Sequence, residues 1–200
     1  MNNHWKTYSE RTKDRPPREL LVKAVAYVRQ KGQALDLGPG ALNDASFLLE
    51  QGFQTVVAVN KDPLEADPVA QSRAATFPQD RFVYRVSPFD AFDFKPDEYD
   101  LINAQYALPF NQPETFDRMF ASLIASLKPG GIVTGQFFGP KDEWSSDTSM
   151  TFVTREQAQQ LLHDCEIISF QENEGMDSLA LGGQKYWHTF HFIARKKQPS

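Results

Sequence analysis

The chain has 200 residues, 40% of them hydrophobic, and a formal net charge of −5. This length suits one domain with a full core rather than two. No apolar run approaches the roughly 18 residues that span a bilayer, and the amino-terminal residues lack the apolar core of a secretory signal. The acidic balance argues against nucleic acid, which favours a basic face. We expect one domain over residues 1–200, with residues 1–18 as an amino-terminal extension, and neither a membrane nor a nucleic acid as partner.

Cysteine and histidine usage bears on compartment and metal binding. Cys165 is alone, so no internal disulfide is possible and a reducing compartment, the cytoplasm, is expected. His188 and His191 lie three positions apart on a predicted strand, so their side chains point to opposite faces. Neither they nor the neighbourhood of Cys165 has a recognisable ligand spacing. We expect no metal site.

The first predicted elements are a helix, a strand that ends in a glycine turn, and a second helix. Residues 20–28 carry apolar side chains at helical spacing. Residues 33–40 (QALDLGPG) form a short buried strand that breaks at Gly38 and Gly40, where glycine allows the backbone to come close to a ligand. An amphipathic helix over residues 44–51 follows. This order indicates a nucleotide-type site at the carboxyl end of a first parallel strand.

Asp36, two positions before the first glycine, indicates which nucleotide fits. Its carboxylate would repel a pyrophosphate but would hold a ligand that has an ammonium group and no phosphate. S-adenosylmethionine fits that description, although capping of the turn is a simpler role for Asp36. A dinucleotide fingerprint would need glycine where Asn43 stands and an acidic residue near the position of Asn60. We therefore expect S-adenosylmethionine as the cofactor.

The rest of the chain alternates strands with helices, which predicts a mostly parallel sheet covered on both faces. Helix signals are a start at Asp67–Pro68, an apolar stripe over residues 116–127 that Pro129–Gly131 would end, and a capping box of Thr154 and Gln157. Strands are expected at residues 56–60, 82–86, 99–104, 132–138, 167–170 and 187–194.

Five segments, in this order, resemble the motifs of class I S-adenosylmethionine-dependent methyltransferases. They are DLGPG at 36–40, VVAVN at 56–60, FDAF at 89–92, YDLINA at 99–104 and LKPGG at 127–131. The resemblance runs from about Leu20 to Arg195, with Leu42 where a third glycine is usual. It implies an α/β fold in one Rossmann-like domain, whose seven-stranded, mostly parallel sheet has helices on both faces. It also implies that the last strand is antiparallel and inserted beside the fifth.

The resemblance also implies cofactor contacts by position. Asn60 would accept from the ribose, where related enzymes usually have Asp or Glu, so the contact lacks charge. Asp90 would meet the adenine amino group and the Ala91 amide a ring nitrogen, although an Asx turn is the simpler role for Asp90. The cofactor-binding candidates are Asp36, Gly38, Gly40, Asn60, Asp90, Ala91 and Ala104.

Residues 104–110 leave the fourth strand where such folds place the methyl acceptor. Gln105 and Tyr106 are therefore our candidates for catalytic residues that face the methyl group, with loop packing as the alternative. Positioning can supply much of the acceleration, because methyl transfer is an in-line displacement.

Aromatic residues elsewhere are candidates for the pocket and for a lid. Phe137, Phe138 and Trp144 are candidates for a pocket wall, although aromatic residues after a central strand are more often core. Trp5 and Tyr8 either close over the cofactor as a lid or only pack a frayed terminus.

The expected function is methyl transfer to a small-molecule acceptor. Residues 183–188 (GQKYWH) resemble an ending found in bacterial methyltransferases of the tellurite-resistance type, where Lys185 or His188 would approach the substrate opening. Leu42 and Asn60 keep a non-catalytic module open, one that binds S-adenosylmethionine or S-adenosylhomocysteine. An accessory subunit of a methyltransferase complex is a further alternative. The sequence does not indicate the acceptor or the oligomeric state.

Overall fold

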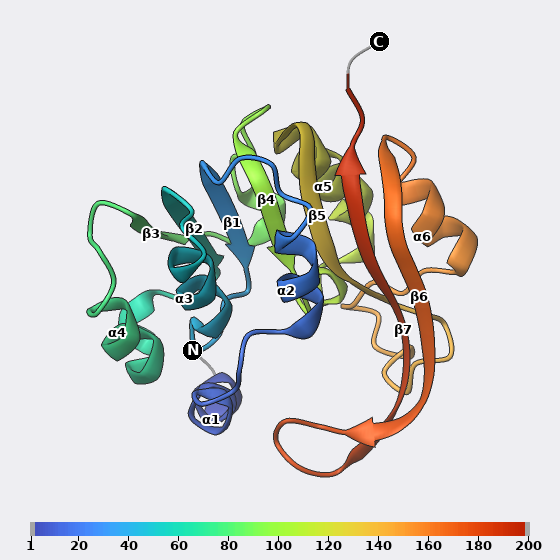
Figure 1. Ribbon diagram of the computed structural model, residues 1–200. Helices are drawn as coiled ribbons and strands as arrows, with labels where there is room; N and C mark the ends of the chain where they lie inside the picture. The colour runs from blue at the N-terminus through green and yellow to red at the C-terminus, as the bar shows by residue number, and fades with distance from the viewer. Residues whose placement is uncertain (1–2, 199–200) are drawn as a thin grey trace.

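The computed structural model describes residues 3–198, and its strands form one sheet (Figure 1). Residues 1–2 and 199–200, which belong to the expected domain, lie outside the described residues. The sheet has the order β3-β2-β1-β4-β5-β7-β6. Its strands are β1 Gln33–Leu37, β2 Thr55–Asn60, β3 Phe82–Val86, β4 Tyr99–Ala104, β5 Leu127–Phe138, β6 Cys165–Ser178 and β7 Gln184–Lys196.

The strand directions confirm the predicted fold class. Strands β1 to β5 pair in parallel, whereas β7 pairs antiparallel with both β5 and β6. The last strand is thus inserted beside the fifth. The chain order of the strands reverses between β1 and β4, and ligands of open α/β sheets bind outside the carboxyl ends of the strands at such a point.

Helices cover both faces of the sheet. One face packs against α2, α3 and α4, and the other against α5 and α6, and each face has its own apolar core. Within residues 3–198 no helix combines the length and the apolar character that crossing a membrane requires. The helices are α1 Asn3–Thr12, α2 Glu19–Val25, α3 Asn43–Glu50, α4 Pro68–Ala74, α5 Pro113–Ser126 and α6 Arg155–Leu161, with the short 3-10 helices η1 Leu64–Ala66, η2 Phe89–Ala91 and η3 Leu108–Phe110.

Two predicted helix starts are confirmed by their caps. The Asp67 carboxylate accepts hydrogen bonds from the Val69 and Ala70 amides, and Pro68 occupies the first helical position of α4. Thr154 and Gln157 form a reciprocal capping box at the start of α6. In both helices a side chain satisfies amide groups that have no partner within the helix.

Several predicted boundaries were wrong. Helix α2 ends at Val25, and α5 ends at Ser126, before the segment that was expected to end it. Residues 127–131 instead open β5, where Leu127 pairs with Tyr99 and the register shifts before Ile132, so the extra residues bulge out. Strand β6 extends well beyond its predicted limits, because its outer half carries exposed polar residues that hide the apolar pattern, and β7, which pairs with it, extends by a few residues at each end.

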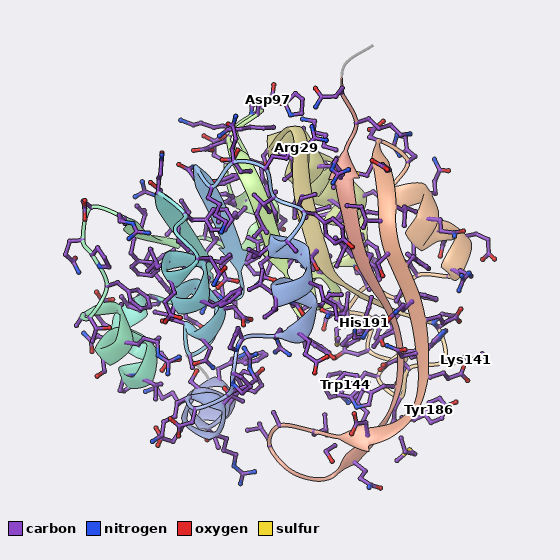
Figure 2. The ribbon with its side chains drawn as sticks, in the orientation of Figure 1. Arg29, Asp97, Lys141, Trp144, Tyr186 and His191 are labelled. Atoms are coloured by element: carbon purple, nitrogen blue, oxygen red, sulfur yellow. The ribbon has the colours of Figure 1, made fainter. Side chains whose placement is uncertain are left out.

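Helix α1 and the turn between β6 and β7 lie beyond the carboxyl ends of the parallel strands (Figure 1). Arg11 of α1 donates a hydrogen bond to the Leu181 carbonyl in that turn, so the two segments meet there. Arg29 and Asp97, labelled in Figure 2, mark the opposite end of the sheet. The candidate site therefore lies at the end that α1 approaches.

Candidate functional site

The glycine turn after β1 has the backbone that its sequence predicts. Gly38 and Gly40 have φ values of +66° and +51°, in the left-handed region that favours glycine. A Cβ on Gly38 would lie 3.2 Å from the Ala107 side chain, so the turn packs closely against the segment after β4. Leu42, at φ 62°, has a left-handed backbone at the position where the motif that the sequence resembles has a third glycine. Its side chain is fully buried, and the burial offsets the strain.

Asp36, at the end of β1, is a buried carboxyl with one oxygen unsatisfied. Asn103 donates a hydrogen bond of 2.8 Å to Oδ1, while Oδ2 is buried and has no hydrogen-bond partner. Burial and, secondarily, the nearby charge of Asp44 raise the pKa of Asp36 to about 8. A cationic group beside Oδ2 would supply the missing partner.

Two arginines approach the same place from the segment between α1 and α2. Arg15 contacts the Asp44 carboxylate at 3.2 Å and the Arg18 guanidinium contacts it at 3.6 Å. The Arg18 amide also donates to Asp44, at 3.0 Å. Both arginines border a small cavity of about 20 Å³ together with Asp36 and the glycine turn. The cavity thus offers two cations and a buried carboxyl side by side.

A chain of buried amide groups connects Asp36 to the segment after β4. Gln105 donates to Asn103 at 2.8 Å, and Gln136 donates to Gln105 at 3.2 Å. The Tyr106 amide in turn donates to Gln136 at 2.9 Å. Gln105, a predicted catalytic residue, borders the small cavity, but its side-chain amide is engaged at both ends. These bonds fix the backbone that carries Tyr106.

Tyr106, the second predicted catalytic residue, has a strained backbone and a crowded ring. Its φ of 54° is uncommon for a bulky residue, and such strain clusters at functional sites. The Arg18 guanidinium lies over the ring at 4.5 Å, while Trp187 and His191 meet it edge-on at 5.9 and 6.3 Å. Burial raises the pKa of the Tyr106 hydroxyl, which therefore stays protonated at neutral pH. The ring joins the arginines to an aromatic cluster.

The predicted pocket wall divides into two groups. Phe137 stacks on Phe192 at 4.7 Å in the core and does not line a pocket. The ring centres of Phe138 and Trp144 lie 6.3 Å apart, and Trp144 borders a hollow of about 360 Å³. Trp144 and His191 lie on the side of β7 that faces α1 (Figure 2). The hollow is lined by Phe110, Glu143, Trp144, Ser146, Asp147 and Met150.

Lys185 is buried behind this wall and does not approach the opening. Its side chain is 0% exposed, and its ammonium contacts Asp142 at 2.5 Å in an ion pair without hydrogen-bond geometry. The same ammonium lies 3.8 Å from the Trp187 ring centre and 4.4 Å from that of Trp144. Burial lowers the pKa of Lys185. The lysine fixes both indoles through cation–π contacts.

Helix α1 covers the glycine turn and reaches the aromatic cluster. A Cβ on Gly40 would lie 3.6 Å from the Tyr8 ring. Trp5 meets both Tyr8 and Phe110 edge-on at 5.8 Å. Ser9 donates to the Asp67 carboxylate at 2.5 Å and thereby attaches α1 to the start of α4. The two aromatic residues expected at a lid thus lie over the site.

The remaining cofactor candidates lie at the ends of neighbouring strands. Asn60 is half-buried at the end of β2, near Tyr84. Asp90 and Ala91 are exposed on η2 after β3, whereas Ala104 is fully buried and pairs with Gly135. All four lie at or just after the carboxyl ends of parallel strands, and therefore at the same edge of the sheet. Their contact with one ligand stays a prediction.

His188 belongs to a cluster with Glu172 and Glu174 whose ligand atoms lie within 4.8 Å of one another. His188 contacts Glu172 at 2.9 Å, and Lys141 pairs with Glu174 at 2.9 Å. Arg155 neutralises Glu172 at 2.6 Å. The acidic groups thus have cationic partners from the chain itself, and the cluster offers no metal assignment.

Sequence reasoning missed several site residues. Asn103 and Gln136 carry a signal, because each is a polar residue inside an apolar strand and a buried polar group needs a partner. The segment RPPR, with Arg15 and Arg18, has no periodicity that indicates a site. Asp44 was assigned to an amphipathic helix without a further role, because a carboxylate in the first turn is an ordinary helix feature.

Comparisons with known proteins agree with this fold. No family model matches the chain, and no curated protein matches it in sequence. A methyltransferase from Methanosarcina mazei, described as S-adenosylmethionine-dependent, superposes with a TM-score of 0.69 at 18% identity, over 92% of this chain and 100% of the other. The 1,6-didemethyltoxoflavin-N1-methyltransferase of Burkholderia thailandensis, with bound S-adenosylhomocysteine, superposes with a TM-score of 0.64 at 20% identity. The superposition covers 90% of this chain and 79% of the other. TehB from Haemophilus influenzae superposes with a TM-score of 0.73 at 16% identity, over 88% of this chain and 61% of TehB. The chain therefore has the fold of class I methyltransferases.

Proposed function

We propose that the protein is an S-adenosylmethionine-dependent methyltransferase that acts on a small-molecule acceptor. The observation that carries the proposal is the buried, unpartnered Oδ2 of Asp36 beside two left-handed glycines. A ligand with an ammonium group would satisfy this oxygen and neutralise the carboxylate. In the fold of class I methyltransferases this position suits the methionine end of the cofactor.

The residues present fit that cofactor. Asp36 would hold its ammonium, and the guanidinium groups of Arg15 and Arg18, which pair with Asp44, would also face its carboxylate. Gly38 and Gly40 would allow the backbone of the turn to come close to the cofactor. The ribose and the adenine would lie toward the predicted contacts Asn60, Asp90 and Ala91.

The chemistry supplied by the cofactor is a methyl group on a positively charged sulfur. When bound, the cofactor would give this methyl group to a lone pair of the acceptor and keep the electrons of the carbon–sulfur bond as a neutral thioether, and a proton on the acceptor atom would leave to water. Tyr106 would orient the acceptor, because the amide chain through Gln105 and Gln136 fixes its backbone. Catalysis then rests on positioning.

Calorimetry tests the proposal directly. S-adenosylmethionine and S-adenosylhomocysteine should both bind the full chain with one ligand per chain, and NAD should not bind, because its pyrophosphate offers no cation to the buried Oδ2 of Asp36. Binding of NAD alone would overturn the proposal.

A non-catalytic module that binds the same cofactor is the second candidate. Leu42 and Asn60, which depart from the family pattern, support it. The small-molecule acceptor is supported by the Burkholderia neighbour, and the likeness to TehB suggests the tellurite-resistance subgroup. Release of S-adenosylhomocysteine across a panel of thiols, amines, carboxylates and metalloid oxyanions separates an enzyme from a module.

A further inference from the structure

The hollow beside the loop after β5 is large enough for a molecule of one or two rings. Its volume is about 360 Å³, within the range of small-molecule sites. The cavity near Asp36 holds only about 20 Å³. We propose that this hollow binds the methyl acceptor and that the acceptor is a planar, positively charged ring compound, an inference that rests on the proposed function.

The floor of the hollow is aromatic and apolar. Phe110 is 40% exposed and meets Trp144 with ring centres 6.3 Å apart and planes tilted by 56°. Met150 adds a buried, polarisable thioether. Lys185 contacts the Trp144 ring and does not line the hollow, so it fixes the indole. A rigid aromatic floor favours planar rings over flexible chains.

The rim of the hollow is acidic. Glu143 and Asp147 are exposed there, and hydrogen bonds from Ser149 lower the pKa of Asp147, which keeps it ionised. The described residues that line the hollow include no lysine, arginine or histidine. The nearby Lys141 is paired with Glu174, and Figure 2 shows it on the other side of β7 from Trp144. The charge of the rim therefore selects a cation and disfavours an anion.

A series of neighbouring aromatic rings runs from the hollow to Tyr106 at the proposed transfer site. The ring centres of Phe110 and Phe138 lie 6.2 Å apart, and those of Phe138 and Tyr106 lie 6.3 Å apart. A ring seated on Phe110 and Trp144 thus lies along the aromatic cluster that Tyr106 joins. The same side chains that hold the acceptor would lead its reacting atom toward the cofactor.

Calorimetric titrations with two probes test the chemical class. 4-Aminoquinoline is a planar cation at neutral pH, and quinoline-4-carboxylate is a planar anion with the same rings. Each is titrated into the full chain, both free and saturated with S-adenosylhomocysteine. We expect the cation to bind roughly tenfold more tightly than the anion, since two rim carboxylates each contribute modestly.

Variants assign the preference to named residues. The double variant Glu143→Gln and Asp147→Asn keeps the shape of the rim, so it should reduce the preference to about twofold or less. Trp144→Ala should weaken both probes. Asp80→Asn, which removes an exposed carboxylate just before β3 at the far side of the sheet, is the matched control and should keep the full preference.

The outcomes separate this inference from the proposed function. Tighter binding of the anion, or equal affinities, would overturn the chemical class. No binding of either probe while S-adenosylhomocysteine binds would overturn the hollow as the acceptor site. No binding of S-adenosylhomocysteine would contradict the proposed function, while the titrations of the free chain still decide whether the hollow selects cations.

Discussion

The two sides of the site differ in chemistry and in access. The polar side, formed by Asp36, Asp44, Arg15, Arg18 and Asn103, is built from buried charges and hydrogen bonds around a cavity of about 20 Å³. The aromatic side, formed by Tyr106, Phe110, Phe138, Trp144 and Trp187, is built from rings in edge-on and tilted contact beside a hollow of about 360 Å³.

The difference suggests how two ligands are kept apart. The polar side would recognise a ligand by a few charges of fixed position, so it tolerates little change in that ligand. The aromatic side would recognise shape and net charge, so related acceptors could share it. Single substitutions on each side should therefore fail in different ways.

The largest effect is expected at the glycine turn of the polar side. Gly40→Val should abolish cofactor binding, because a branched residue at φ +51° strains the turn and its methyl groups would fill the space between the turn and Tyr8, whose ring lies 3.6 Å from the Cβ position. Gly52→Val is the matched control, since Gly52 has φ +89° with open space around it and lies away from the site. Calorimetry with S-adenosylhomocysteine is the measurement. Retained affinity in Gly40→Val would show that no ligand lies against this turn.

Asp36→Asn should weaken cofactor binding and yet stabilise the free protein. Losing a hydrogen bond to a charged group costs about 1.5–3 kcal/mol, so affinity should fall roughly tenfold to a hundredfold. Removing a buried carboxylate without a counterion should raise the free energy of unfolding at mildly alkaline pH by on the order of 1–3 kcal/mol. Urea unfolding of the free variant measures the second effect. If Asp36→Asn is less stable than the original protein and binds the cofactor with unchanged affinity, both predictions are wrong.

The pKa of Asp36 also predicts how binding and stability depend on pH. Burial raises this pKa from 3.8 to about 8, so the free protein carries the proton at neutral pH. Pairing with an ammonium needs the carboxylate, so binding should release a proton and tighten as the pH rises toward about 8. In the free protein the raised pKa means that this group's contribution to stability declines as the pH rises from about 4 to about 8. Calorimetry in buffers of different ionisation enthalpy counts the released protons.

On the aromatic side, Tyr106→Ala should slow methyl transfer and leave cofactor affinity nearly unchanged. The ring would position the acceptor, so we expect kcat to fall about tenfold or more, while cofactor affinity changes about twofold or less. Tyr106→Phe keeps the ring and should retain most of the rate. An equal loss of affinity and rate in Tyr106→Ala would place the ring at the cofactor instead.

The smallest effect is expected at Asn60, an uncharged residue at the edge of the polar side. Asn60→Leu should weaken cofactor binding by about 1 kcal/mol, roughly fivefold, if Asn60 accepts from the ribose. Asn60→Asp should keep or tighten binding, because a charged acceptor is stronger. Identical affinities for all three proteins would remove Asn60 from the site.

At the polar side, Asp36 and the glycine turn were predictable because their motif is local. Strand, glycine turn and helix follow one another within residues 33–51, and each has its own periodicity or φ requirement. Arg15 and Arg18 escaped, because a segment without regular structure has no periodicity to analyse. The strand limits failed mainly in β6, where polar residues on exposed faces interrupt the apolar alternation.

The aromatic side was harder, because residues distant in the chain assemble it. Tyr106, Trp144 and Trp187 come from three separate segments, and only the antiparallel insertion of β7 beside β5 brings them together. Phe137 and Phe138 differ by one position and point to opposite faces of β5, one into the core and one into the cluster. The sequence shows both as aromatic and does not indicate which face is which.

The attachment of α1 has a kinetic consequence. Hydrogen bonds join α1 and the residues just after it to Asp67 and Arg73 at α4, to Asn43 of α3 and to Leu181 in the turn between β6 and β7. A molecule enclosed beneath Tyr8 leaves only after these polar contacts open together. We therefore expect the lifetime of the bound state to depend on this helix more than on the contacts of the ligand itself. Cofactor exchange would then set the pace of the cycle, as product release does in many enzymes with lids.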